Sequence, residues 1–274
     1  AAPIFKDFMK DVLMDKPDIP FRRPPGIKFI SVNPETGLQV NSKDKKSILE
    51  AFIHAGAANE VKVEVVSIHS EQLNVDNCEL QLKGLHGLLV APGFGSRGIE
   101  GKISAIKYVR ENNIPFFGIC LGMQMAVIEY ARNVVGLAFA NSTEMDEDTP
   151  HPVISLMDEQ KNVENKGGTM RLGAWDCTLT TGSGVHNIYK ADDISERHRH
   201  RYELNNAYLA DLTKNGLKAT GVNPETGLAE IVEIDAHPWF VGVQYHPEYK
   251  STVLEPHPLF SAFVEACNNY ANKK

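Results

Sequence analysis

One cysteine of this 274-residue sequence occupies a setting in which a thiol can act as a nucleophile. Cys120 lies between an apolar run typical of a buried strand and a segment with helical periodicity, with Gly118 and Gly122 two residues to either side. This is the pattern of a nucleophile elbow, a sharp strand-to-helix turn that needs both glycines because larger side chains would collide with neighbouring elements. The dipole and free N–H groups at the start of a helix favour a thiolate. We therefore predict that Cys120 is a reactive nucleophile.

A second segment supplies the groups that a thiolate nucleophile requires. His246 and Glu248 follow the apolar run Trp239–Val243, with Pro247 stiffening the chain between them. Acyl transfer needs a base that takes and returns protons, and a further group that orients this base. A strand that ends before His246 would place both side chains at the sheet edge where the elbow lies. The order Cys120, His246, Glu248 therefore predicts a catalytic triad.

A glycine-rich loop, Pro92–Gly98, directly follows another apolar run. Its exposed N–H groups could hold a developing oxyanion, and we expect the N–H groups of Gly93 and Leu121 to form this hole. Pro92 has no N–H, so Gly93 must supply the donor from the loop. Phosphate binding is disfavoured because the spacing of the phosphate-loop motif is absent.

The elements that must position these residues alternate between short apolar runs and longer periodic runs. This alternation predicts an α/β fold, with an open, mostly parallel, twisted sheet and helices on both faces. We expect strands at Ile27–Val32, Val61–Ile68, Gly87–Ala91, Ile114–Ile119, Val153–Leu156 and Trp239–Tyr245. We expect helices at Asp44–His54, Glu100–Asn112, Met123–Asn133 and Leu259–Ala271.

The start of the chain differs from the rest in composition. Apolar residues from Ile4 to Leu13 recur on one helical face, and a proline-rich stretch typical of a linker follows. We divide the chain into a helix and linker, residues 1–25, and one α/β domain, residues 26–274. The helix could pack on this domain or on a neighbouring one. A repeated heptapeptide, at Val32–Leu38 and Val222–Leu228, predicts two similar tight turns.

The composition disfavours several classes of protein. A formal net charge of -7 gives no general attraction to nucleic acid or anionic lipid. No apolar run approaches the roughly 20 residues that cross a bilayer, and the first residues lack the apolar core of a signal peptide. The 4 cysteines show no paired spacing, which fits a reducing compartment. We expect a cytoplasmic protein that binds neither nucleic acid nor membrane.

The elbow, the His-Pro-Glu segment and the glycine-rich loop together resemble the class I, triad-type glutamine amidotransferases. The stretches Ala140–Glu144, Gly167–Gly173 and Arg197–Asn205 resemble the glutaminase domain of the CTP synthases in particular. The resemblance implies a triad of Cys120, His246 and Glu248. It also implies a glutamine site formed by Gly93, Leu121, Gly122, Met123, Gln124, Glu144 and Arg201. Glu144 and Arg201 suit the α-ammonium and α-carboxylate of glutamine. We reject a zinc site at His198 and His200, because arginines alternate with them.

The resemblance further implies hydrolysis of glutamine to glutamate and ammonia through a γ-glutamyl thioester, with no cofactor in this domain. In the family, ammonia passes to a synthetase domain that aminates UTP to CTP with ATP and Mg²⁺, and GTP is an allosteric effector. Nothing in this chain resembles that domain, which we expect in cis within a homo-oligomer, a tetramer that can form filaments. Two alternatives stay open. One is another class I amidotransferase or a γ-glutamyl hydrolase, and the other is a regulatory or filament-assembly module with the same fold.

Overall fold

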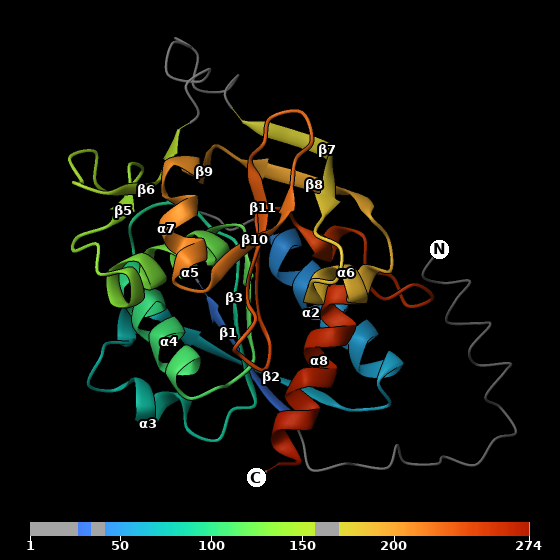
Figure 1. Ribbon diagram of the computed structural model, residues 1–274. Helices are drawn as coiled ribbons and strands as arrows, with labels where there is room; N and C mark the ends of the chain where they lie inside the picture. The colour runs from blue at the N-terminus through green and yellow to red at the C-terminus, as the bar shows by residue number, and fades with distance from the viewer. Residues whose placement is uncertain (1–26, 34–41, 157–169, 274) are drawn as a thin grey trace, which may run out of the picture.

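The computed structural model describes residues 27–33, 42–156 and 170–273. Within these ranges the chain forms a nine-stranded sheet, a three-stranded sheet and helices around them (Figure 1). The larger sheet contains β1 Ile27–Asn33, β2 Val63–His69, β3 Gly87–Val90, β4 Phe116–Ile119, β7 Arg171–Leu179, β8 Asp193–His200, β10 Leu217–Val222, β11 Ala229–Ile234 and β12 Phe240–Val243. The smaller sheet contains β5 Asn141–Ser142, β6 Pro152–Leu156 and β9 Tyr202–Leu204.

The helices of the described ranges include four long ones, at or near the predicted positions. The α-helices are α2 Ser42–Ala58, α3 Cys78–Leu82, α4 Ile99–Glu111, α5 Leu121–Tyr130, α6 Gly184–Tyr189, α7 Leu209–Lys214 and α8 Pro258–Ala271. Short turns are η1 Ser70–Gln72, η2 Ala131–Val135, η5 Asn206–Tyr208 and η6 Pro247–Tyr249, of which η2 is a π-helical turn that follows α5 directly. The helix predicted from Met123 begins two residues earlier, immediately after Cys120.

The large sheet has a parallel half and an antiparallel half. Its order is β2-β1-β3-β4-β12-β11-β10-β7-β8. The first five strands pair in parallel and the remaining pairs are antiparallel. The α/β class with helices on both faces is confirmed, but parallel pairing is confined to one half. The strands β7, β8, β10 and β11 were not predicted. In β8 the buried residues Glu196, His198 and His200 are polar and hide the apolar alternation.

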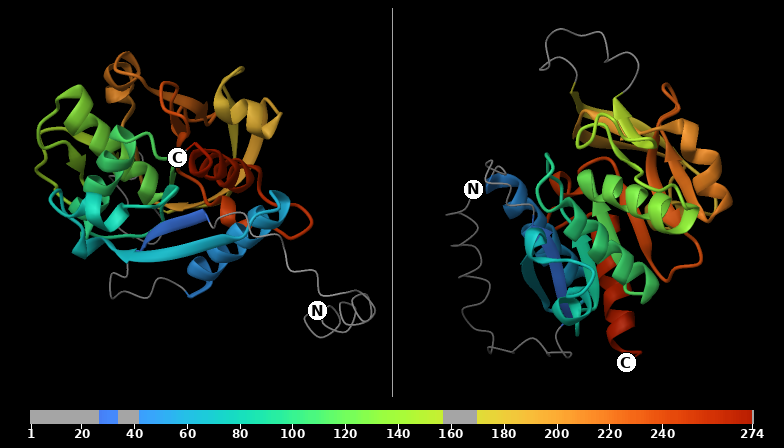
Figure 2. Two further views of the ribbon diagram at one scale, coloured as in Figure 1. Left: turned by 90° about the horizontal axis from the view of Figure 1, so that it is seen from below. Right: turned by 90° about the vertical axis from the view of Figure 1, so that its left-hand side faces the viewer.

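Two apolar cores lie on opposite faces of the parallel half. Leu88 and Phe116 belong to the core with α4 and α5, whereas their neighbours Leu89 and Phe117 belong to the core with α2 and α8. This alternation is the period of two expected for strands covered on both faces. Figures 1 and 2 show α4 and α5 on one side of these strands and α2 and α8 on the other. All ten residues of α5 are buried, because the small sheet covers the side of the helix that the large sheet does not.

The remaining predictions about organisation are tested only in part. The helix and linker predicted for residues 1–25 lie outside the described residues, as does most of the first heptapeptide copy. The second copy forms the predicted tight turn between β10 and β11. Asn223 Oδ1 accepts the N–H groups of Glu225 and Thr226, and Gly227 has a φ of 69°. No helix in the described part of the chain is long and apolar enough to cross a membrane.

Candidate active site

Cys120 forms a strained turn between β4 and α5. Its φ of 52° and ψ of -103° are rare for a residue with a side chain, and such strain is typical of functional turns. A Cβ atom on Gly118 would lie 2.7 Å from backbone atoms of Gly122, and one on Gly122 would lie 2.2 Å from the carbonyl oxygen of Val90. Both glycines are therefore required sterically, as the elbow pattern predicted.

The parallel pairing of β4 with β12 brings the two predicted motifs together. Ile119 is paired with Val243, and the Cys120 N–H donates to the Val243 carbonyl at 2.7 Å. The segment that follows β12 therefore begins beside the elbow. The His246 N–H donates to the Arg197 carbonyl at 2.8 Å, which ties this segment to β8 as well.

His246 is held by a buried carboxylate. Its Nδ1 lies 2.8 Å from Glu248 Oε1, and because a carboxylate only accepts, Nδ1 carries the proton of this hydrogen bond. Burial alone would lower the pKa of His246, but Glu248 and the adjacent Cys120 thiol outweigh it and raise the pKa to about 10. The imidazole therefore favours its charged form at neutral pH, with Nε2 left for Cys120.

The other three cysteines have raised pKa values. Cys78, Cys177 and Cys267 are buried and form no disulfide in the described structure. Burial raises the pKa of Cys78 to about 11, and it also raises the pKa of Cys177 and Cys267. These three side chains are therefore neutral thiols at physiological pH.

The glycine-rich loop contacts the predicted acid of the glutamine site. The Gly95 N–H donates to Glu144 Oε1 at 3.2 Å. Burial raises the pKa of Glu144, while the Gly95 hydrogen bond and the nearby Arg201 oppose this effect. No described residue accepts the N–H of Gly93, and Leu121 is the first residue of α5, where N–H groups have no partner within the helix. The two donors predicted for the oxyanion hole therefore remain available.

Gln124 links the predicted substrate residues to the nucleophile. Its Nε2 donates to the carbonyl oxygen of Tyr202 at 2.9 Å and lies 3.2 Å from Gln244 Oε1. Tyr202 directly follows Arg201, so this hydrogen bond holds the backbone next to the arginine against α5. The Met123 side chain is fully buried against Gly242 of β12, which leaves only its backbone for contact with a substrate.

Gln244 is a neighbour of Cys120 that was not predicted. Its Nε2 lies 3.7 Å from Cys120 Sγ, and the residue is fully buried. The signal in the sequence was its place two residues before His246, directly after the strand that pairs with β4.

A cluster of buried ionisable side chains lies behind His246. The Arg171 guanidinium contacts Glu203 at 3.3 Å and Glu230 at 2.6 Å, and His198 Nδ1 lies 2.7 Å from His200 Nε2. Burial raises the pKa of Glu203 to about 8 and that of Glu230 to about 7. It also lowers the pKa of His198 to about 3, an effect to which Arg171 and His246 add.

The reason given for rejecting zinc at the two histidines was wrong. Arg197 is exposed and Arg199 half-buried on the opposite face of β8 from His198 and His200, so neither arginine repels a cation there. The cation beside the histidines is Arg171, which sequence spacing could not place. In the described ranges, no three His, Cys, Asp or Glu side chains are arranged to hold a metal ion.

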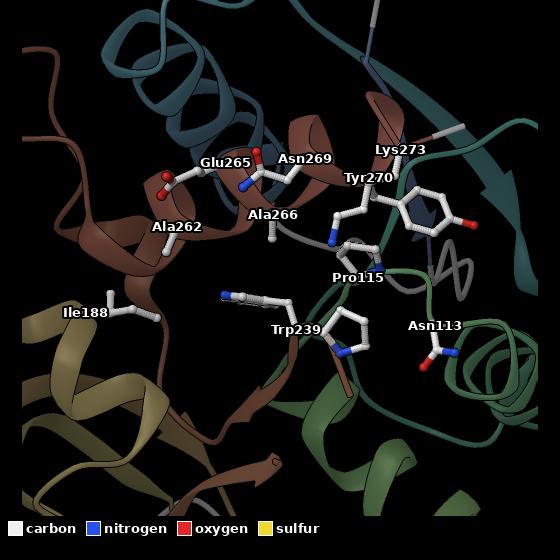
Figure 3. Close-up of a pocket in the computed structure, with 11 residues that line it drawn as sticks. Asn113, Pro115, Ile188, Trp239, Ala262, Glu265, Ala266, Asn269, Tyr270 and Lys273 are labelled. Atoms are coloured by element: carbon white, nitrogen blue, oxygen red, sulfur yellow. The ribbon is translucent and has the colours of Figure 1, made fainter. Parts of the chain in front are cut away.

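A separate hollow of about 560 Å³ lies at the other end of β12 from His246 (Figure 3). Trp239, which precedes β12, faces α8 there across Ala262 and Ala266. The hollow and the cluster around Cys120 are therefore distinct places in the fold.

Comparison with known proteins gives the class to which this fold and site belong. The family described as glutamine amidotransferase class-I matches residues 42–266. The chain belongs to this family.

Relatives of the chain within the family include CTP synthases. The chain is 69% identical over 229 residues to the CTP synthase of Flavobacterium johnsoniae, covering 84% of this chain and 42% of the relative. It is 58% identical over 284 residues to that of Flavobacterium psychrophilum, covering 98% of this chain and 53% of the relative. The chain thus spans about half the length of these relatives.

A solved structure supports the same placement. The glutaminase domain of the Trypanosoma brucei CTPS, with bound acivicin, matches with a TM-score of 0.80 and 39% identity. The match covers 89% of this chain and 94% of that domain. The α/β fold described above is thus that of a CTP synthase glutaminase domain.

Proposed function

We propose that this chain hydrolyses the side-chain amide of glutamine, with Cys120 as nucleophile, His246 as proton carrier and Glu248 as the group that orients and charges His246. The observation that carries the proposal is the hydrogen bond of His246 to Glu248 at the end of β12, the strand whose last residue accepts the N–H of Cys120. The acivicin-bound relative and the membership in the amidotransferase family support glutamine as the substrate.

In the first half of the reaction, the Cys120 thiolate attacks the amide carbon of glutamine. The N–H groups of Gly93 and Leu121 hold the resulting oxyanion. The charged His246 donates its Nε2 proton to the departing nitrogen, and ammonia leaves as the γ-glutamyl thioester forms. A raised pKa suits this role, because the imidazole begins the reaction with the proton that it must give.

In the second half, the now neutral His246 takes a proton from water, and the resulting hydroxide attacks the thioester carbon. Collapse of the tetrahedral intermediate breaks the C–S bond, releases glutamate and restores the thiolate and the imidazolium. Glu144 and Arg201 pair with the α-ammonium and α-carboxylate of glutamine throughout both steps.

The ammonia is proposed to serve a synthetase domain in cis, because the relatives are about twice as long as this chain. That domain would aminate UTP to CTP with ATP and Mg²⁺, under control by GTP, and no cofactor is proposed for the glutaminase reaction. A homo-oligomer and a cytoplasmic location remain predictions, the latter resting on the unpaired cysteines.

The test is glutamate release from glutamine by the wild type and by Cys120→Ala, together with mass spectrometry after treatment with a diazoketone analogue of glutamine. We expect Cys120→Ala to release no glutamate above background, and we expect the adduct on Cys120. Equal release by the variant, or an adduct on Cys78, Cys177 or Cys267 instead, would refute the assignment. If this chain hydrolyses glutamine but makes no CTP from UTP and ATP, its activity is the glutaminase reaction alone, and CTP formation requires the proposed synthetase domain.

A further inference from the structure

Two side chains of one segment reach the proposed nucleophile. Gln244 Nε2 lies 3.7 Å from Cys120 Sγ, and the same thiol is close enough to His246 to raise the histidine pKa. Tyr245, between them, points instead into the core under α2 and α8. The backbone fixes this placement, since the carbonyl of the preceding Val243 accepts the Cys120 N–H. The backbone therefore fixes the position of Gln244 next to Cys120.

The hydrogen bonds determine which end of the Gln244 amide faces the sulfur. A backbone carbonyl can only accept, so the terminal atom of Gln124 that lies 2.9 Å from the Tyr202 oxygen must be Nε2. The second N–H of this nitrogen points to the terminal atom of Gln244 at 3.2 Å, which must then be Oε1. The remaining terminal atom of Gln244, its Nε2, faces Cys120 Sγ as a donor.

We propose that Gln244 is a catalytic residue that stabilises the Cys120 thiolate by donating this N–H···S hydrogen bond. The proposal rests on the proposed role of Cys120 as the nucleophile. A donor on the sulfur favours thiolate over thiol, because hydrogen bonds to charged groups are stronger than those between neutral groups. An amide achieves this without adding charge and without competing with His246 for a proton.

The same three hydrogen bonds connect the nucleophile to the glutamine site. The series runs from the Tyr202 carbonyl through Gln124 and Gln244 to Cys120 Sγ. Tyr202 follows Arg201, the residue proposed to bind the substrate carboxylate. If the Tyr202 carbonyl moved away, the Gln124 amide could rotate and Gln244 could turn its oxygen to the sulfur. The orientation of the Gln244 amide is therefore coupled to the position of Tyr202.

The test is the pH profile of Cys120 alkylation by iodoacetamide in Gln244→Met, followed by intact-mass spectrometry. Methionine has a similar length but no N–H, and iodoacetamide is too small to require Glu144 or Arg201. We expect the midpoint of the profile to move upward by about 1 pH unit, which is about tenfold slower alkylation on the acidic side. The matched control is Gln81→Met, the same change at an exposed position of α3, which should leave the midpoint unchanged.

A folded Gln244→Met protein with the midpoint of the control would overturn the proposal. If urea unfolding shows that Gln244→Met does not fold, Gln124→Met decides, because it leaves Gln244 in place but removes the group that orients it. An upward shift in Gln124→Met supports the proposal and an unchanged midpoint overturns it. Wild-type alkylation no faster than that of Cys120→Ala would instead overturn the nucleophile assignment, and this proposal with it.

Discussion

Replacing Glu248 by glutamine removes a buried charge while keeping the size of the side chain. The carboxylate accepts the Nδ1–H of His246 at 2.8 Å and is the main group that raises the histidine pKa to about 10, from an ordinary 6.5. At 1.36 kcal/mol per pKa unit, this difference corresponds to about 5 kcal/mol of stabilisation of the folded state. Breaking a buried ion pair by removing one partner costs about 3–5 kcal/mol. The value from the pKa difference and the cost of breaking a buried ion pair are therefore of similar size.

The loss should depend on pH in a defined direction. A pKa that is raised on folding stabilises the protein fully below the ordinary value of 6.5, and this contribution disappears as the pH rises through about 10. We expect Glu248→Gln to lower the free energy of unfolding by about 3–5 kcal/mol at pH 6 and by much less above pH 10. Glutaminase activity should fall as well, because the neutral imidazole lacks the proton for the departing ammonia.

The assay is urea unfolding at several pH values between 6 and 10.5, with Glu225→Gln as the matched control. Glu225 lies in the exposed turn between β10 and β11, where the same substitution should change stability by no more than about 0.5 kcal/mol. A loss of equal size at both ends of the pH range, or no loss at pH 6, would refute the reasoning from the buried ion pair.

Three further substitutions test other parts of the site. Gly122→Ala places a Cβ atom 2.2 Å from the Val90 carbonyl oxygen. Urea unfolding should therefore show a free energy of unfolding lower by about 1–3 kcal/mol or more. Wild-type stability would contradict the steric role of the glycine. Arg171→Met leaves Glu203 and Glu230 buried without their cation, and the raised pKa values of both carboxyl groups favour the protonated form at low pH. The free energy of unfolding should therefore fall by about 3–5 kcal/mol, and by more at pH 9 than at pH 5.5. A loss that does not depend on pH would contradict this role of Arg171. Glu144→Gln should raise the KM for glutamine about tenfold with little change in kcat, and an unchanged KM would remove Glu144 from the proposed pocket.

The inner strands of the parallel half, β3, β4 and β12, were predictable because they are covered on both faces. The runs around Leu88 and Phe116 are continuously apolar, so they are recognisable without tertiary information. The elbow was predictable for a local reason, since the backbone of Cys120 and the two close approaches at Gly118 and Gly122 are encoded within five residues.

The antiparallel half was not predictable from the same signals. The buried face of β8 contains Glu196, His198 and His200, which indicate exposure when read locally. Glu196 is buried against His257 and Lys250. His198 and His200 are buried as neutral rings in contact with each other. His257 and Lys250 are distant in sequence from β8, so neither burial nor pairing can be inferred from one strand. The orientation of Gln244 depends in the same way on a carbonyl of a different sheet, at Tyr202.

The two-sheet construction has a consequence for how the protein can be switched off. Cys120 and His246 are held by the large sheet, whereas Glu144 follows β5 and Arg201 precedes β9, two strands of the small sheet. Local opening of the small sheet would displace the two residues that are proposed to bind glutamine, while the thiol and imidazole stayed in place. Faster amide hydrogen exchange in β5 and β9 would then indicate opening of the proposed glutamine-binding residues. Unchanged exchange in β4 and β12 would indicate that the strands before Cys120 and His246 stay folded.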